Sequence, residues 1–198
     1  MLQVMYKVLT KQNSFEINPK KIHIIGSVGS GKTTLAKTLS KTLNIPFYEL
    51  DNVVWVRGDN GDVKRTEIER EAYLQTLVKT ESWIIEGVHQ EDWVAISFQY
   101  ADIIIFLDPN YMIRIFRIIK RYGKQKLGIE KANYTPTFHI FKNMFIWNKY
   151  FEEVAKPHFF NKYSHLKDKT VILTNTREFI QQMTDPKTEG VAKHDTRI

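Results

Sequence analysis

The 198-residue sequence contains no cysteine. A disulfide framework and a thiolate metal site are therefore both excluded. No apolar stretch approaches the ~20 residues that a bilayer-spanning helix needs. Residues 1–20 mix Lys, Gln, Asn and Glu among the apolar residues, unlike a secretory signal peptide. From these absences we expect a cytoplasmic location and no membrane partner.

Eight consecutive residues, Gly26 to Thr33, match the pattern G-x-x-x-x-G-K-[ST] at every position. An apolar run at 22–25 precedes them, and residues 34–43 have a helix-like pattern. This order of strand, loop and helix is the context in which the pattern binds phosphate. The glycines let backbone N–H groups and a helix N-terminus point at an anion. The sequence therefore predicts a site for a nucleoside triphosphate.

We define residues 26–33 as the phosphate loop, and two of its side chains have specific expected roles. Lys32 is expected to reach the β- and γ-phosphates, and the Thr33 hydroxyl to be a ligand of Mg²⁺. Thr34, the first residue of the predicted helix, is also expected to bind the nucleotide. The predicted nucleotide-binding residues of this segment are Gly26, Ser27, Val28, Gly29, Ser30, Gly31, Lys32, Thr33 and Thr34.

Positive charge is concentrated in one segment of the chain. The net charge is +7, and residues 114–126 hold six of the basic side chains: Arg114, Arg117, Lys120, Arg121, Lys124 and Lys126. A DNA-binding face more often forms a broad basic stripe. A single cluster beside a phosphate loop therefore favours phosphate chemistry over nucleic-acid binding, without excluding the latter.

Strand and helix patterns alternate along the chain, which is typical of a parallel sheet with covering helices. Strands are predicted at 21–25, 46–50, 82–86, 102–107 and 170–173, and helices at 34–43, 66–79, 111–122 and 177–183. The second helix begins with a capping box, Thr66-Glu67-Ile68-Glu69. Asp108, before Pro109, is expected to cap the third. The predicted fold is α/β: a three-layer α/β/α P-loop NTPase with a five-stranded parallel sheet.

The alternation breaks between Tyr122 and Lys169, and we interpret residues 122–165 as an inserted helical lid. Phe138, Phe141 and Phe145 fall on one helix face, which is the usual signature of a core seam. The alternative is an aromatic surface that stacks on single-stranded nucleic acid. The remaining parts are an N-terminal extension at 1–20, a domain at 21–183 and a polar tail at 184–198.

Residues 21–183 resemble a small P-loop kinase of the adenylate kinase and shikimate kinase type. More closely, they resemble the bacterial topology modulation (FlaR-like) proteins of that superfamily. Besides the phosphate loop, the resemblance rests on residues 44–55, on Trp83-Ile84-Ile85-Glu86-Gly87, on residues 101–108 and on the arginines that follow. It implies ATP, Mg²⁺ and a small-molecule phosphoryl acceptor. A nucleotide or nucleoside acceptor leads, followed by a small hydroxylated metabolite.

One departure concerns the acceptor. Adenylate kinases continue their third strand with G-F-P-R, whose arginine grips the acceptor phosphate, but this chain continues Gly87-Val88-His89-Gln90-Glu91. The missing arginine weighs against a nucleoside monophosphate. His89 is expected to be a surface residue of this loop.

The arginines of the helix that enters the lid are the expected phosphate clamp. Arg114, Arg117 and Arg121 are three and four residues apart, and so are neighbours on that helix. A planar guanidinium binds phosphate oxygens in pairs and keeps its charge. Arg117 and Arg121 are predicted to be catalytic and Arg114 to bind nucleotide, the alternative being a solvated basic face. The resemblance also implies that Arg177 stacks on adenine, although a surface charge fits equally.

Two carboxylates end predicted strands, at the edge where open α/β sheets bind ligands. Shikimate kinase-like enzymes place an acceptor-binding Asp where this chain has Asp51, which makes Asp51 the candidate to orient or deprotonate an acceptor hydroxyl. A simple turn residue fits Asp51 equally well. Glu86 is the candidate to hold Mg²⁺ through water or to contact the acceptor, the alternative being a solvated loop residue.

A second class of function stays open. In it the chain is an ATP-binding regulatory or DNA-associated protein with weak ATPase activity. That reading predicts slow hydrolysis without an acceptor and salt-sensitive DNA binding. The sequence does not predict an oligomeric state.

Overall fold

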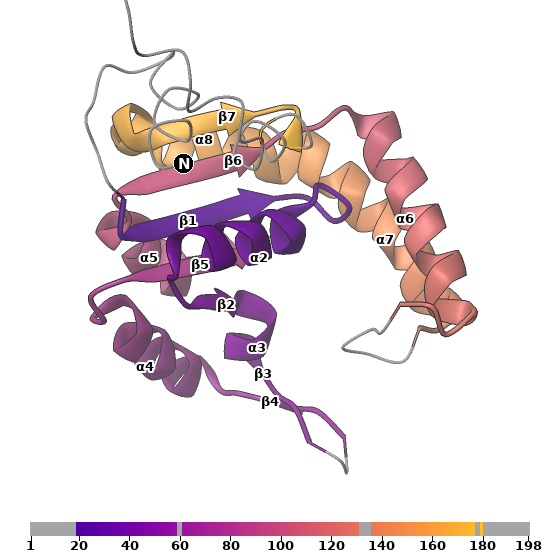
Figure 1. Ribbon diagram of the computed structural model, residues 1–198, viewed down its shortest axis with the longest axis horizontal. Coiled ribbons are helices and arrows are strands. Elements are labelled where there is room, and N and C mark those ends of the chain that lie inside the picture. Colours follow the sequence, from indigo (N-terminus) through magenta and orange to yellow (C-terminus); the bar gives the residue numbers. More distant parts are fainter. Residues whose placement is uncertain (1–18, 59–60, 131–135, 177–178, 180–198) are drawn as a thin grey trace, which may run out of the picture.

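The computed structural model describes residues 19–58, 61–130, 136–176 and 179. Its main sheet has five parallel strands in the order β2-β5-β1-β6-β7 (Figure 1). Their bounds, β1 Lys21–Gly26, β2 Phe47–Glu49, β5 Trp83–Gly87, β6 Ile103–Leu107 and β7 Thr170–Leu173, agree with the predicted ones to within one residue. Apart from residue 179, the predicted helix at 177–183 lies outside the described residues, as do residues 1–18 of the predicted extension at 1–20 and the tail at 184–198.

Helices cover both faces of this sheet, because its strands are apolar on both faces. Ile22 and Ile24 of β1 pack in one apolar cluster with α2 (Lys32–Leu43). The opposite cluster contains Ile25 and residues of α4 (Glu67–Val78), α5 (Ala95–Tyr100) and α8 (Lys156–Lys162). The predicted three-layer α/β/α fold is thus confirmed. None of the helices in the described ranges is long and apolar enough to pass through a membrane.

Helix starts follow local side-chain chemistry. The Thr66 hydroxyl accepts from Glu69 N at 3.3 Å, and the Glu69 carboxylate accepts from Thr66 N at 2.8 Å, which confirms the predicted capping box of α4. For α6 (Tyr111–Lys126) the predicted cap was wrong. Asn110 is the cap, because its Oδ1 lies 2.9 Å from Met112 N, two residues on, where an N-cap acceptor must be. Asp108 instead pairs with Lys156 at 2.7 Å.

Several short elements were not predicted. A short helix, α3 (Leu50–Val54), follows β2, and a two-stranded antiparallel hairpin, β3 (Trp55–Val56) and β4 (Val63–Lys64), follows α3. The 3-10 helix η1 (Asp92–Val94) and α5 fill the connection between β5 and β6. Each is too short to show a helical or strand period in the sequence.

The range expected to form the lid has two parts. α6 and α7 (Phe138–Tyr150) lie side by side at one end of the sheet, where Tyr122 stacks on Phe141 with ring centroids 4.1 Å apart (Figure 1). α7 continues through a π-helical turn, η2 (Phe151–Ala155), into α8, and a 3-10 helix, η3 (Ser164–Lys169), leads to β7. Phe159 of α8 is buried in the sheet core, whereas Phe138 at the start of α7 is 68% exposed. Only the α6–α7 part therefore stands away from the core.

Candidate functional site

The phosphate loop has a conformation that only glycine adopts without strain. Gly29 and Gly31 have φ angles of 74° and 99°, in the left-handed region. A Cβ on Gly29 would lie 2.9 Å from the carbonyl oxygen of Arg114, and one on Gly26 would lie 2.8 Å from Ser30 Oγ. Side chains at these glycine positions would clash or be strained, so the loop has the compact backbone that the sequence predicted.

Lys32, the first residue of α2, lies across this loop. Its Nζ donates to the carbonyl oxygen of Ser27 at 3.0 Å. Burial lowers the pKa of Lys32, and the nearby carboxylates of Glu86 and Asp51 oppose that shift. An ammonium group beside the free N–H groups of a helix N-terminus forms a site for an anion such as a phosphate chain.

Thr33 and Glu86, the two residues predicted to hold Mg²⁺, are in direct contact. Thr33 Oγ1 donates to Glu86 Oε1 at 2.5 Å, and Glu86 is only 4% exposed near the end of β5. Burial raises the pKa of Glu86, while Lys32 and Thr33 oppose that shift. A hydroxyl and a carboxylate are hard oxygen ligands of the kind that Mg²⁺ takes.

The structure describes no group of three His, Cys, Asp or Glu side chains suited to a metal ion. A Mg²⁺ ion usually keeps several waters and takes only one or two protein ligands, with substrate phosphates supplying others. The Thr33–Glu86 pair fits that pattern.

Asp51 lies in the first turn of α3, directly after β2, with a side chain that is 66% exposed. Its Oδ1 is 3.7 Å from Nε2 of His89, and the interaction with the His89 ring lowers the pKa of the Asp51 carboxyl. Asp51 also interacts electrostatically with Lys32. The structure therefore brings the predicted acceptor carboxylate to the same end of the sheet as the phosphate loop.

His89 is a site residue whose surroundings the sequence did not reveal. Its ring lies between Asp51 and Glu91, with Nδ1 3.3 Å from the Glu91 carboxylate, and packs 5.3 Å from the Trp93 ring. Burial alone would lower the pKa of His89, but the two carboxylates outweigh it and raise the pKa to about 9. His89 is thus a cation at neutral pH.

The three arginines of α6 lie in three different environments. Arg117 Nη1 donates to the carbonyl oxygens of Gly29 and Ser30, at 3.3 and 2.9 Å. Arg121 is half exposed, pairs with Glu130 at 3.4 Å, and interacts electrostatically with Lys32. Arg114 is fully buried and forms an ion pair with Glu152 of η2. Arg177 lies outside the described residues.

Known proteins resemble this chain in sequence. An uncharacterized protein of Bacillus subtilis strain 168, YqaC, is 34% identical over 125 residues, which are 60% of this chain and 68% of YqaC. The shikimate kinase of Aquifex aeolicus strain VF5 is 35% identical over 77 residues, or 39% of this chain and 44% of that enzyme. The chain thus matches less than half the length of that kinase.

A solved structure and a protein family agree with the fold. Shikimate kinase from Acinetobacter baumannii, solved with shikimate, superposes with a TM-score of 0.50 and 17% identity, over 89% of this chain and 97% of that one. Such a likeness confirms the predicted P-loop NTPase fold. Residues 22–134 match the family described as AAA domain. Because this match covers more than half of the 198 residues, the protein belongs to the AAA domain family.

Proposed function

We propose that this protein is a kinase that transfers the γ-phosphate of ATP to a hydroxyl group of a small acceptor. The observation that carries the proposal is the contact of Thr33, in a phosphate loop whose glycines are left-handed, with Glu86 of β5, close to Lys32. The relatedness to shikimate kinase supports the same reaction class. Bound Mg²⁺ would neutralise charge on the phosphates.

The residues of the site have complementary tasks in this proposal. Lys32 and the N-terminus of α2 bind the phosphate oxygens. Asp51, held as a carboxylate by His89, accepts a hydrogen bond from the acceptor hydroxyl and orients it for in-line attack. Arg121 is half exposed near Lys32 and would exchange its surface ion pair with Glu130 for the transferred group. Arg117 stabilises the loop and does not contact the phosphates, since its guanidinium already donates to the loop carbonyl oxygens.

For the acceptor we propose a nucleoside or another small polyhydroxylated molecule in preference to a nucleoside monophosphate. The arginines around α3 already bind groups of the protein: Arg57 pairs with Asp62, Arg65 donates to the carbonyl oxygen of Asn52, and Arg70 pairs with Glu67. The connection after β5 places His89 between two carboxylates. Such surroundings favour hydroxyl donors over an acceptor phosphate.

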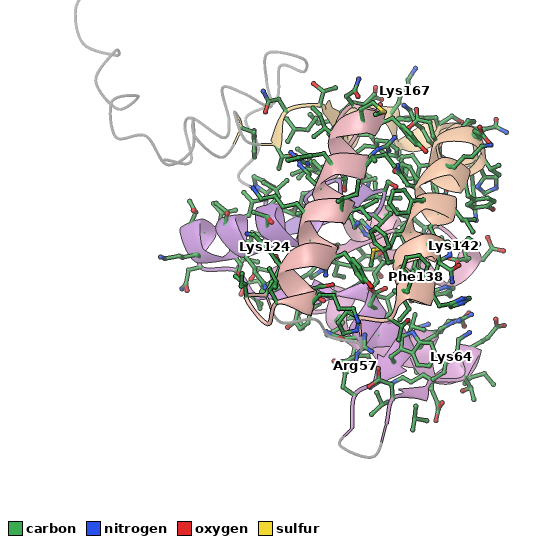
Figure 2. The ribbon with its side chains drawn as sticks, turned by 90° about the vertical axis from the view of Figure 1, so that its right-hand side faces the viewer. Arg57, Lys64, Lys124, Phe138, Lys142 and Lys167 are labelled. Atoms are coloured by element: carbon green, nitrogen blue, oxygen red, sulfur yellow. The ribbon has the colours of Figure 1, made fainter. Side chains whose placement is uncertain are left out.

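A second candidate function follows from the resemblance to topology modulation proteins. In it the chain is an ATP-binding regulatory or DNA-associated protein. One surface favours it: Lys124 of α6 and Phe138 and Lys142 of α7 lie on one face of the molecule, with Arg57 and Lys64 of the β3–β4 hairpin (Figure 2). Basic and aromatic side chains together suit a nucleic-acid strand.

ADP production separates the two functions. The purified chain is supplied with ATP and Mg²⁺ and with one candidate at a time: nucleosides, nucleoside monophosphates, shikimate, gluconate or duplex DNA. Lys32→Ala, which removes the ammonium group from the phosphate site, is the blank. The kinase proposal predicts a rate increase of 10²-fold or more, on the order expected for a positioned acceptor, with one small hydroxylated molecule. Stimulation by DNA alone would refute the kinase proposal and support the regulatory one.

A further inference from the structure

Asn148, near the end of α7, is a buried polar residue to which the proposed chemistry assigns no task. It is fully buried, and its Oδ1 accepts a hydrogen bond from Ser27 Oγ at 2.9 Å. Ser27 is also fully buried and is the second residue of the phosphate loop. The Nδ2 of Asn148 has no hydrogen-bond partner among the residues that the structure describes. Among the described residues, the bond from Ser27 is thus the polar contact of this side chain, and it satisfies Oδ1 but not Nδ2.

Burying an amide is costly unless the amide is hydrogen-bonded, so an apolar residue at position 148 would fit a purely structural role better. The other buried residue of α7 in the described range, Met144, lies one turn earlier and is apolar. An amide at this one position is explained by its bond to the loop.

α6 contacts the same loop from a second direction. Arg117 Nη1 donates to the carbonyl oxygens of Gly29 and Ser30, and the backbone of Arg114 lies so close to Gly29 that a Cβ there would be 2.9 Å from its oxygen. The loop is thus held on its outer side by both helices of the α6–α7 pair. The opposite ends of these helices stand away from the sheet (Figure 1).

The two helices are also joined behind the loop. Arg114 of α6 pairs with Glu152 in the π-helical turn that directly follows α7, and Lys156 bridges Glu152 and Asp108 at 3.1 and 2.7 Å. π-Helical turns are rare and often occur at functional sites. This network fixes the end of α7 that carries Asn148 relative to α6 and the end of β6. A conformational change of the phosphate loop would therefore alter the position of α7.

We propose that Asn148 is a positioning residue for the phosphate loop, which it holds through Ser27, and that this bond couples nucleotide binding to the arrangement of α7. The inference rests on the nucleotide-binding part of the proposed function and does not depend on any acceptor. Because coupling between two sites is reciprocal, nucleotide in the loop must stabilise α7 as much as α7 favours nucleotide binding.

The test is the affinity for MgATP, measured by titration calorimetry on the full chain with Asn148→Ala, Ser27→Ala and the double variant. Each single variant is expected to weaken binding by about fivefold or more, on the scale of one lost hydrogen bond in a buried site. The double variant is expected to be no more than about twofold weaker than either single one, since both remove the same bond. Ser27→Ala removes only a hydroxyl, so it remains informative if Asn148→Ala fails to fold.

Asn143→Ala is the matched control, because Asn143 lies on the same helix and contacts His139 rather than the loop. It should bind MgATP as the wild type does. Affinities within twofold of the wild type for both single variants would overturn the proposal, as would fully additive effects in the double variant. A lower melting temperature alone would then show a role in stability only.

Hydrogen exchange supplies a readout that a merely structural residue would not change. MgATP is expected to slow amide exchange in the last turn of α7 of the wild type, and to slow it only in the phosphate loop of Asn148→Ala. Equal protection of α7 in both proteins would overturn the coupling. A wild-type chain that binds MgATP but phosphorylates no acceptor would refute the kinase proposal and leave this inference standing.

Discussion

Glu86 is a carboxylate that the fold has placed out of water, 4% exposed, against a threonine hydroxyl of the phosphate loop. A buried charge of this kind is expensive unless a cation or donor compensates it. Lys32 and Thr33 provide part of that compensation. A bound Mg²⁺ ion, held directly or through water, would supply the remaining compensation for the buried charge of Glu86.

Glu86→Gln preserves the shape of the side chain and removes its charge. We expect the magnesium concentration for half-maximal phosphoryl transfer to rise by about 10- to 100-fold, the range found when groups that support a metal site are changed. The measurement is the initial rate against magnesium concentration at saturating ATP. Glu81→Gln is the control, because Glu81 is exposed at the surface, where it pairs with Lys20. An unchanged magnesium dependence in Glu86→Gln would remove Glu86 from the metal site.

His89 makes stability depend on pH. Its pKa is raised to about 9 in the folded chain from about 6.5 when unfolded, so its contribution is fully present below pH 6.5 and is lost as the pH rises through 9. Both partner carboxylates are more than half exposed, which reduces the contribution to about 1 kcal/mol. His89→Gln should therefore be less stable than the wild type by about that amount at pH 6, but not at pH 10. Urea unfolding at both pH values measures this, and a difference that stays constant with pH would contradict it.

At the scale of single elements, the α4 capping box satisfies two N–H groups that the helix itself leaves free. Thr66→Ala removes the hydroxyl acceptor and should lower the free energy of unfolding by about 1 kcal/mol. Thr76→Ala is the control in the same helix, because the Thr76 hydroxyl lies away from the cap and donates to the carbonyl oxygen of Tyr73. Denaturant unfolding of both variants gives the comparison. Equal losses would mean that the cap contributes nothing.

The five strands of the main sheet were predictable from the sequence, whereas several short elements were not. All five strands were placed to within one residue, since each is rich in apolar or aromatic residues and is bounded by polar residues or glycine. α3, with five residues, is held by tertiary packing, and the β3–β4 hairpin, with two exposed residues in each strand, is too short to form a pattern. Leu50 and Val53 of α3, for example, are buried in the core beneath α4. That packing is not visible in a local pattern.

The candidate site divides in the same way. The phosphate loop was predictable because its pattern is continuous in sequence and because Gly29 and Gly31 occupy positions with a positive φ angle. The proximity of His89 to Asp51 was not, because it depends on α3 turning back toward the connection after β5. The three arginines lie on one helix, α6, as their spacing indicated. Tertiary packing alone decides that Arg114 is buried while Arg121 faces solvent.

At the scale of the whole molecule, the site lies where the carboxyl ends of neighbouring parallel strands meet. In the register of the sheet, Ile25 pairs with Gly87 and Glu49 with Glu86, so the ends of β1, β5 and β2 are level. This edge of an α/β sheet is the usual place for a ligand. The loop after β1, Glu86 at the end of β5 and Asp51 after β2 thus reach one volume, with α6 and α7 beside it (Figure 1).

The fate of the γ-phosphate tests the kinase assignment most directly. The full chain is incubated with Mg²⁺, ATP labelled in the γ-phosphate, and a pooled set of nucleosides and polyhydroxylated metabolites, and the labelled products are separated. A kinase places most of the label in one organic phosphate ester, and Lys32→Ala abolishes that product. Label found only in inorganic phosphate, at a rate that no small molecule changes, would contradict phosphoryl transfer to a small acceptor.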